Sequence, residues 1–263
     1  MISLKGKKAL ITGASSGFGA DFADILAKKG MDLVITARRE DKLNTLKEKI
    51  VEKYGVNVRV IVMDLAGFDA AEKLYSIVKD ENIDMLINNA GYGMYGWFER
   101  QDAAALNRMV QLNVVAAFVL ANLFAKDFSE KNSGWILNVA SFAAFNPTPF
   151  YAVYGATKAF LMNFSVALRT EFKKQRKNVC VTALCPGFTA TEFVERAGQK
   201  RSKFLEMSIG KSYPAAEEAI NALLKNKPVV MPRLMNRIGA FFLRFMPRSL
   251  AAEAAFMSIK DKE

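Results

Sequence analysis

Short apolar runs alternate with longer helical stretches along most of the chain. The apolar runs predict strands at Lys8–Thr12, Asp32–Ala37, Val58–Met63, Met85–Asn88, Gly134–Ala140, Val179–Leu184 and Pro228–Met231. The stretches between them predict helices at Gly17–Lys29, Glu40–Tyr54, Ala70–Glu81, Asp102–Lys131, Tyr154–Arg176 and Pro214–Lys225. Apolar residues three and four positions apart are typical of helices, and unbroken apolar runs are typical of strands buried on both sides.

Repeated strand–helix–strand units predict an α/β fold in which right-handed crossovers join parallel strands. We therefore expect one doubly wound parallel sheet of seven strands with helices on both faces. The length of 263 residues favours a single domain over residues 1–232, followed by a C-terminal amphipathic helical extension over residues 233–263. Ligands of such sheets bind beyond the carboxyl ends of the strands.

Composition and the N-terminal sequence indicate a globular cytoplasmic protein. Apolar residues make up 51% of the chain and charged residues 24%, which is ordinary for a globular domain. The N-terminus leads directly into a strand, without the apolar region and cleavage site of a secretory signal. No stretch approaches the ~20 apolar residues of a membrane span. Cys180 and Cys185 point to opposite faces of one predicted strand, so we expect both to be reduced.

The absence of histidine and the scattered positive charge limit the possible chemistry. Without histidine the chain cannot form a His-based triad or a His-ligated metal site, and two cysteines cannot form a Cys-only zinc site. No metal is therefore expected. The net charge is +11, but the lysines are spread over predicted helix surfaces without interleaved aromatic residues. We expect a basic surface that favours anionic ligands, and no nucleic-acid interface.

A glycine-rich turn follows the first predicted strand and opens the first helix. It reads Thr12-Gly13-Ala-Ser-Ser-Gly17-Phe-Gly19. Glycines at this place permit a tight turn and let the backbone approach a pyrophosphate, which the helix N-terminus then binds. The Gly-x-x-x-Gly-x-Gly spacing differs from the commoner dinucleotide pattern, and no Lys-Ser/Thr pair follows, so the turn is not a Walker loop. The turn predicts a nucleotide site.

Two arginines at the end of the second strand indicate which nucleotide binds. Arg38 and Arg39 lie about 20 residues after the glycines, where an acidic residue would hold the 2′-hydroxyl of NAD(H). Arginine at this place accommodates a 2′-phosphate instead. Glu40 and Asp41 come later and look like first-turn residues of the next helix. We predict NADP(H) as the cofactor, although two arginines could also form a solvated loop.

Three further polar positions follow strands or interrupt an apolar helix. Asp64 after the third strand could accept from an adenine amino group, or could cap a loop. Asn89, Ala90 and Gly91 close the fourth strand with small residues, as a backbone beside a flat ligand requires. Asn113 lies on an apolar helical stretch, where an amide needs its hydrogen bonds met; alone it is best interpreted as structural.

A tyrosine, a lysine and a serine are placed to carry proton transfer. Tyr154 and Lys158 are one helical turn apart, and Ser141 ends an apolar strand. A free phenol titrates near pH ~10, and a fixed cation beside it pulls that pKa towards neutrality. Tyr151 competes, but the residue four positions after it is Gly155. The set suits proton transfer to a carbonyl oxygen.

These motifs, taken in order, resemble the short-chain dehydrogenase/reductase (SDR) family in its short, single-domain branch with a Rossmann fold. The resemblance covers roughly the first 190 residues and includes the glycine turn, the Asn-Asn-Ala-Gly stretch, the serine, tyrosine and lysine, and Pro186-Gly187-Phe-Thr189. It implies an NADP(H)-dependent oxidoreductase that transfers hydride to or from a carbonyl or alcohol carbon. The resemblance implies cofactor contacts at Gly13, Ser15, Ser16, Gly17, Phe18, Gly19, Arg38, Arg39, Asp64, Leu65, Asn89, Ala90, Gly91, Tyr154, Lys158, Pro186, Gly187 and Thr189.

The same resemblance implies roles for the catalytic residues. Tyr154 would be the acid/base, Lys158 would lower its pKa and bind the nicotinamide ribose, and Ser141 would bind the substrate oxygen. Asn113 would hold a water that links Lys158 to solvent. Thr189 would meet the nicotinamide carboxamide. The alternative is a regulatory protein that keeps the fold and binds the cofactor without turnover; the intact catalytic set argues against it.

The expected substrate pocket is aromatic, and the chain ends in an amphipathic tail. Pocket candidates are Tyr92, Met94, Phe142, Phe145 and Phe188, with Tyr95, Trp97, Phe150 and Phe193 as further candidates. They favour an apolar small-molecule substrate, or they could be loop packing. In the tail, an apolar face from Leu234 to Phe245 adjoins a stripe of arginines, and Pro247 breaks the helix. We expect a homo-oligomer whose tail packs against protein and helps to close the site; peripheral membrane contact is the alternative.

Overall fold

Seven parallel strands form one sheet in the computed structural model, which describes residues 3–189, 192–199 and 210–259. The strands are β1 (Lys8–Thr12), β2 (Asp32–Ala37), β3 (Val58–Val62), β4 (Met85–Asn88), β5 (Gly134–Val139), β6 (Val179–Leu184) and β7 (Val229–Val230). Their order across the sheet is β3-β2-β1-β4-β5-β6-β7. The order reverses between β1 and β4, so the carboxyl ends of these strands form the crevice in which doubly wound sheets bind ligands. The predicted fold class is confirmed.

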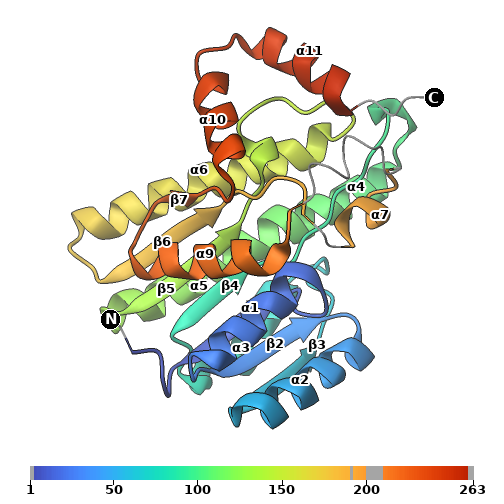
Figure 1. Cartoon of the computed structure of the whole chain (residues 1–263). Coiled ribbons are helices and arrows are strands. Elements are labelled where there is room, and N and C mark those ends of the chain that lie inside the picture. The colour runs from blue at the N-terminus through green and yellow to red at the C-terminus, as the bar shows by residue number, and fades with distance from the viewer. Residues whose placement is uncertain (1–2, 190–191, 200–209, 260–263) are drawn as a thin grey trace.

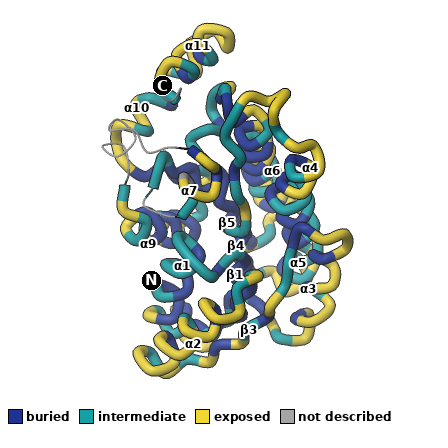
Figure 2. The backbone as a smooth tube through the Cα atoms, turned by 90° about the vertical axis from the view of Figure 1, so that its right-hand side faces the viewer, coloured by how far each residue is buried: buried dark blue, intermediate teal, exposed yellow. Residues whose placement is uncertain are grey.

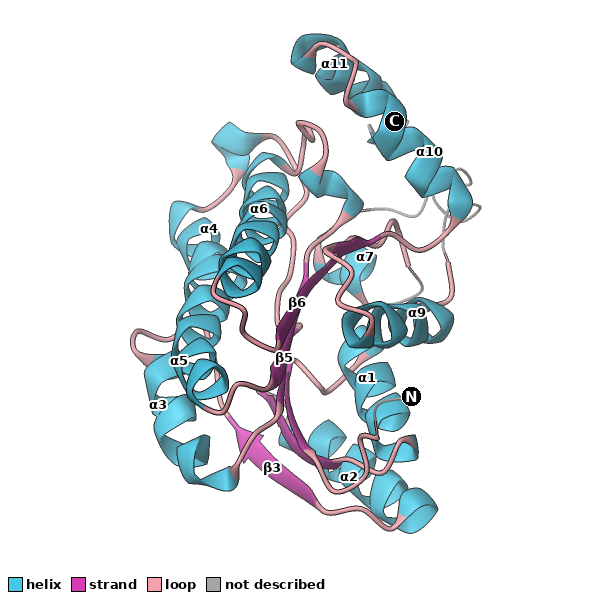
Figure 3. Ribbon diagram, turned by 90° about the vertical axis from the view of Figure 1, so that its left-hand side faces the viewer, coloured by secondary structure: helices cyan, strands magenta, loops and turns pink. Residues whose placement is uncertain are grey.

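Helices cover both faces of the sheet (Figures 1 and 3). One face carries α1 (Gly17–Lys28), α2 (Glu40–Tyr54) and α9 (Ser212–Leu224); the other carries α3 (Ala70–Val78), α4 (Ala103–Val110), α5 (Ala117–Glu130) and α6 (Ala152–Lys174). Short 3₁₀ turns lie at Lys79–Glu81, Phe98–Arg100 and Phe142–Ala144, and α7 spans Phe193–Arg196. Apolar strand residues alternate between two cores, one under each helical layer.

A π-helical turn interrupts the long helix expected over 102–131. It spans Gln111–Ala116, between α4 and α5, and contains Asn113. Such bulges often lie at functional sites because they re-aim one side chain inward. The combined stretch Ala103–Glu130 is long and apolar enough to cross a membrane, because an 18-residue window within it has a mean hydropathy of 1.6. This corrects the statement that no stretch approaches a membrane span. Leu120, Phe124 and Phe128 pack into the core under the sheet, so the stretch is a core helix of the domain.

The C-terminal extension forms two helices that extend from the domain above the end of the sheet (Figure 1). They are α10 (Leu234–Leu243) and α11 (Arg248–Ile259), separated near Pro247 as the sequence predicts; residues 260–263 lie outside the described part. The side towards the domain carries Ala240, Ala251 and Ala255, all buried. The outer side is exposed along most of its length (Figure 2). Small residues on the inner side let both helices approach the site closely.

Candidate active site

The glycine turn between β1 and α1 packs so closely on the segment after β4 that Gly13 and Gly19 have no space for a side chain. Gly13 has φ +68°, a left-handed conformation that favours glycine. A Cβ on Gly19 would collide with the Gly13 carbonyl and lie 2.7 Å from Asn89 Nδ2. The Asn89 amide donates to the Thr12 and Gly13 carbonyls at 2.9 and 3.1 Å. The bare backbone next to the start of α1 therefore fits a pyrophosphate.

Arg39 lies against this turn and is shared by three partners. Its guanidinium donates to Ser15 Oγ at 3.0 Å and to Ser16 Oγ at 2.9 Å. On its other side, Nη1 lies 3.0 Å from Glu192 Oε2. A hydrogen bond from Lys42 and the charges of Arg196 and Arg39 hold the pKa of Glu192 below its usual range, against the effect of partial burial. The donor set of two serine hydroxyls and nearby cations suits a phosphate.

Arg38 and Asp64 lie beside each other at the ends of β2 and β3. Arg38 is largely exposed and its Nη1 is 4.0 Å from Asp64 Oδ2. Asp64 Oδ2 also accepts from Arg108 Nη2 at 2.8 Å, and Oδ1 accepts from Ala66 N at 3.0 Å. Both carboxylate oxygens thus have partners within the chain, as the loop interpretation of Asp64 requires. Leu65 is buried beside it in the core.

The π-helical turn directs Asn113 to the segment after β4. Its Oδ1 accepts from Tyr92 N at 3.1 Å, and its Nδ2 donates to Tyr92 O at 2.9 Å and Thr157 Oγ1 at 3.2 Å. A Cβ on Gly91 would lie 2.9 Å from Asn113 Oδ1 and 3.4 Å from Lys158 Nζ. Asn113 therefore positions the segment of Gly91 and Tyr92 directly beside the lysine.

Ser141, Tyr154 and Lys158 come together at the carboxyl end of β5. Ser141 follows this strand and its Oγ accepts from Ala143 N at 3.2 Å. Tyr154 and Lys158 lie one turn apart on α6, both buried, with Lys158 Nζ 5.7 Å from the tyrosine ring centre. Lys158 Nζ donates to the Val139 carbonyl at 2.7 Å. The structure thus brings together the three residues that the sequence proposes for proton transfer.

Burial controls the titration of this pair. Desolvation raises the pKa of Tyr154 to about 12, opposed by a hydrogen bond with Ser141. Desolvation also lowers the pKa of Lys158 to about 8. The expectation that Lys158 pulls down the pKa of Tyr154 is not met by these contacts, because its ammonium is directed at Val139 O. At neutral pH the phenol keeps its proton.

The segment after β6 forms the far wall of the site and contacts the C-terminal extension. Phe142 N donates to the Pro186 carbonyl at 2.7 Å, and Thr189 Oγ1 donates to Gly187 O at 2.9 Å. A Cβ on Gly187 would lie 2.8 Å from Asn236 Nδ2 of α10. The extension therefore reaches the residues expected to bind the nicotinamide end.

The predicted pocket residues separate into two groups. Tyr92 and Met94 pack in one cluster with Tyr154 and Phe193, whose ring centre is 5.1 Å from that of Tyr154. Phe142 and Phe145 pack in another cluster, beneath Ala240 of α10. A Cβ on Gly239 would be 3.6 Å from the Phe142 ring. Phe188 contributes its carbonyl, which accepts from Gly210 N at 3.0 Å. Tyr92 and Met94 thus share a cluster with Tyr154, and Phe142 and Phe145 do not.

Several contacts near the site carry no signal in the sequence. Tyr151 is buried and its Oη donates to Gln199 at 2.9 Å. Phe256 of α11 stacks on Phe150 at 5.1 Å between ring centres. Glu192 is the carboxylate on Arg39. Each of these contacts joins two segments that are distant in the sequence, so no local motif could have identified it.

Comparison with known proteins gives this fold and site a class. The family model for short chain dehydrogenase matches residues 7–202. Hydroxysteroid dehydrogenase-like protein 1 of Gallus gallus is 34% identical over 95% of this chain and 78% of its own length. Very-long-chain 3-oxoacyl-CoA reductase of Mus musculus is 30% identical over 92% of this chain and 77% of its own.

Solved structures of short-chain dehydrogenases have the same fold as this chain. A short-chain dehydrogenase from Sphingobium yanoikuyae in complex with NADPH has a TM-score of 0.82 at 29% identity, covering 98% of this chain and 97% of that one. A Burkholderia phymatum enzyme in complex with NAD also has a TM-score of 0.82, but at 23% identity it shares only the fold, over 92% and 94% of the two chains. The chain belongs to the short-chain dehydrogenase/reductase family. It is an oxidoreductase acting on CH–OH or C=O groups.

Proposed function

We propose that the protein is an NADP(H)-dependent reductase or dehydrogenase whose substrate is an apolar carbonyl or alcohol compound. The observation that carries this proposal is the buried set of Ser141, Tyr154 and Lys158 at the carboxyl end of β5, next to a glycine turn that fits a pyrophosphate. The choice of NADP(H) rests on Arg38 and Arg39, with Ser15 and Ser16 beside them.

In this mechanism the cofactor supplies hydride exchange between its nicotinamide ring and the substrate carbon. Tyr154 gives its hydroxyl proton to the carbonyl oxygen during reduction, and its raised pKa of about 12 keeps that proton available at neutral pH. Ser141 donates a hydrogen bond to the same oxygen. Lys158, held by the Val139 carbonyl, binds the ribose and stabilises negative charge that develops on Tyr154.

The substrate class follows from the apolar surroundings of Tyr154. Tyr92, Met94, Phe193 and the aromatic residues of the loop before α6 offer few polar groups to a ligand. Two relatives are named for steroid-type and long-chain acyl compounds. We infer a large apolar ketone or secondary alcohol, with 3-oxoacyl thioesters and oxosteroids as the first compounds to test.

The test is an NADPH-oxidation screen against long-chain 3-oxoacyl thioesters, oxosteroids and a broad ketone panel, with NADP⁺ reduction against the matching alcohols. Turnover that disappears in Tyr154→Phe supports the proposal. Tight NADPH binding without turnover of any member would favour the alternative, a cofactor-binding regulator of the same fold.

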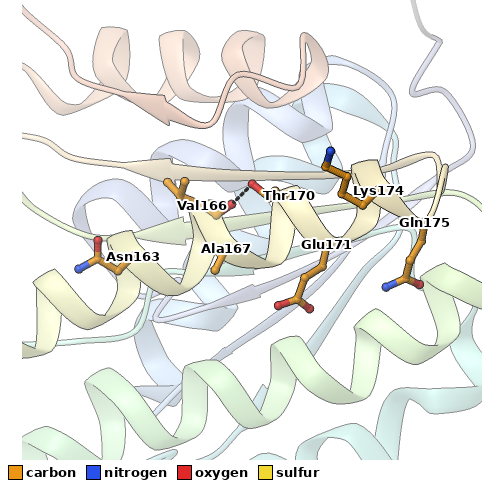
Figure 4. Close-up of a pocket in the computed structure, with 7 residues that line it drawn as sticks. All are labelled: Asn163, Val166, Ala167, Thr170, Glu171, Lys174 and Gln175. Carbon is orange, nitrogen blue, oxygen red and sulfur yellow. Dashed lines mark hydrogen bonds between the residues drawn. The ribbon is translucent and has the colours of Figure 1, made fainter.

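We also propose that the enzyme is a cytoplasmic homo-oligomer. Phe118 of α5 and Phe160 of α6 are exposed together, 6.2 Å apart between ring centres. Beside them a hollow runs along the outer face of α6, lined by Asn163, Val166, Ala167, Thr170, Glu171, Lys174 and Gln175 (Figure 4). An apolar patch beside a groove suits a second copy of the chain. Light scattering on Phe118→Ser/Phe160→Ser, which should lower the mass, tests this surface.

The C-terminal extension offers a second surface for self-association. Its outer side exposes Leu234, Phe241, Phe242 and Phe245, a larger aromatic area than isolated surface residues account for. We propose that another copy of the chain covers it in the oligomer. Arg244 and Arg248 are exposed beside these rings, so an anionic membrane is the alternative partner.

A further inference from the structure

Glu192 is an acidic residue within a group of cations at the edge of the site. Its Oε1 accepts from Lys42 Nζ at 3.0 Å and from Arg39 Nη1 at 3.3 Å. Its Oε2 lies 3.0 Å from Arg39 Nη1 and 2.5 Å from Arg196 Nη2. The Oε2 contacts are ion pairs without the alignment of a hydrogen bond. Three positive side chains thus meet on one carboxylate: Arg39 and Lys42 from the start of α2, and Arg196 from the segment of Glu192 itself.

The same cations border the place where the phosphate groups of the cofactor fit. Arg39 uses its remaining donors on Ser15 and Ser16 of the glycine turn. Lys42 lies on the first turn of α2, directly after the arginines at the end of β2. In a doubly wound sheet, this strand end holds the 2′ position of the adenosine ribose. Glu192 therefore binds cations that a 2′-phosphate would also bind.

We propose that Glu192 is an internal competitor of the 2′-phosphate and thereby sets how strongly the enzyme discriminates NADPH from NADH, a proposal that rests on the NADP(H) assignment above. A carboxylate carries one negative charge and a phosphate monoester about two, so the phosphate is the stronger ligand of the same guanidinium and ammonium groups. Bound NADPH takes over the pairing of Arg39 and Lys42, and Glu192 retains Arg196, four residues along its own segment. NADH has no group that competes for these contacts.

Whether NADPH affinity rises or falls when the charge of Glu192 is removed distinguishes a competing role of Glu192 from a supporting one. If Glu192 only oriented Arg39 for the cofactor, removal of its charge would weaken NADPH binding. In the competitive arrangement, removal of the charge frees two cations and eliminates repulsion of the phosphate. Each partly exposed ion pair is individually weak, so the expected gain is moderate: about five-fold in affinity, or about 1 kcal/mol.

The experiment compares wild type with Glu192→Gln, which keeps shape and loses charge, by titration calorimetry with NADPH and NADH. Glu48→Gln is the matched control, because Glu48 is an exposed carboxylate on α2 with no ion pair to these arginines among the described contacts. The fragments 2′,5′-ADP and 5′-AMP isolate the phosphate without any contribution from the nicotinamide or from catalysis. Circular dichroism checks that the variants fold alike.

The proposal expects Glu192→Gln to bind NADPH and 2′,5′-ADP about five-fold tighter, with NADH and 5′-AMP changed by less than about two-fold, and the control to resemble wild type. Unchanged or weaker NADPH binding would overturn it, as would equal tightening of both cofactors. Failure of the NADP(H) assignment is distinguishable. In that case wild type binds the two cofactors alike, whereas a selective gain in Glu192→Gln still shows that Glu192 competes.

Discussion

The cofactor side of the site and the cover formed by the C-terminal helices α10 and α11 differ in which part of the chain makes the contacts. On the cofactor side the main chain itself forms the binding surface, because Gly13 and Gly19 lie so close to Asn89 that a single added methyl group would collide. In the cover, side chains make the contacts: α10 and α11 meet the site through Asn236, Ala240 and Phe256. The aromatic side of the two helices stays exposed. We therefore expect the glycine positions of the first region to tolerate fewer substitutions than the exposed side of the second.

This difference separates chemistry from specificity. A backbone cradle suits the pyrophosphate that NAD(H) and NADP(H) share, so it does not depend on which of the two cofactors binds. A cover of side chains can change without disturbing the cradle, which lets a fold of this kind accept new substrates. Substitutions on the cofactor side should therefore alter catalysis or cofactor binding strongly, and changes to the cover should alter substrate binding more mildly.

The largest effect is expected at Tyr154. Tyr154→Phe removes the proton donor while retaining the ring, so kcat should fall by at least about a hundred-fold with NADPH affinity nearly unchanged. Stopped-flow turnover and NADPH titration measure the two quantities. Tyr151→Phe is the matched control, since Tyr151 donates to Gln199, and it should lose far less activity. Near-normal kcat in Tyr154→Phe, on a substrate where chemistry limits the rate, would remove the mechanism.

The second prediction is that the buried ammonium of Lys158 lowers the free energy of unfolding of the wild type. Its folded-state pKa is lowered to about 8 from 10.5, so below pH 8 a buried charge destabilises the fold by about 3 kcal/mol at about 1.36 kcal/mol per unit. Lys158→Met also loses the hydrogen bond to Val139 O, which offsets about 1 kcal/mol of this gain in stability. Lys158→Met should thus be about 2 kcal/mol more stable in urea at pH 7, although turnover and cofactor binding suffer.

The pH dependence gives this prediction its check. Because the folded pKa of Lys158 is depressed, the wild type regains stability as pH rises from about 8 towards the unfolded value of 10.5. The advantage of Lys158→Met should therefore shrink over that interval. A variant that is less stable than wild type at pH 7 would show that the ammonium is stabilising where it lies.

Cofactor choice comes next in size. NADPH should bind at least about ten-fold tighter than NADH, equivalent to about 1.4 kcal/mol. Arg38→Ala should abolish most of this preference, and Arg39→Ala less, because Arg39 is already engaged by Ser15, Ser16 and Glu192. Fluorescence titration with both cofactors measures the ratio. Equal affinities in the wild type would refute the assignment.

The sequence predicts the two regions unequally well, for a physical reason. The strands and the glycine turn follow from local patterns, and all seven strands agree with expectation to within one residue at either end. The π-helical turn at Asn113 carries no such pattern, because an added residue in a helix leaves its apolar periodicity almost intact. The sequence also does not predict which of the pocket candidates lie beside Tyr154. Phe142 and Phe145 face α10, whereas Phe193 packs on Tyr154, and these pairings join segments far apart in the chain.

The smallest effect, and the sharpest test of the comparison, concerns the cover. Truncation after Pro232 removes Asn236 from Gly187 and Phe256 from Phe150, which opens the pocket but leaves the glycine turn untouched. KM should then rise about five-fold, corresponding to about 1 kcal/mol of lost substrate contact, with NADPH binding largely retained. Steady-state kinetics on the substrate found by screening measures this change.

A second variant separates the two sides of the cover. Phe241→Ser/Phe245→Ser alters only the exposed side, so KM should stay near wild type while the oligomer mass measured by light scattering falls. If mass and kinetics are both unchanged and salt-sensitive binding to anionic vesicles is lost instead, the outer side meets a membrane and not a second subunit. If truncation weakens NADPH binding as strongly as it raises KM, the cover belongs to the cofactor site, and the division between the two regions fails.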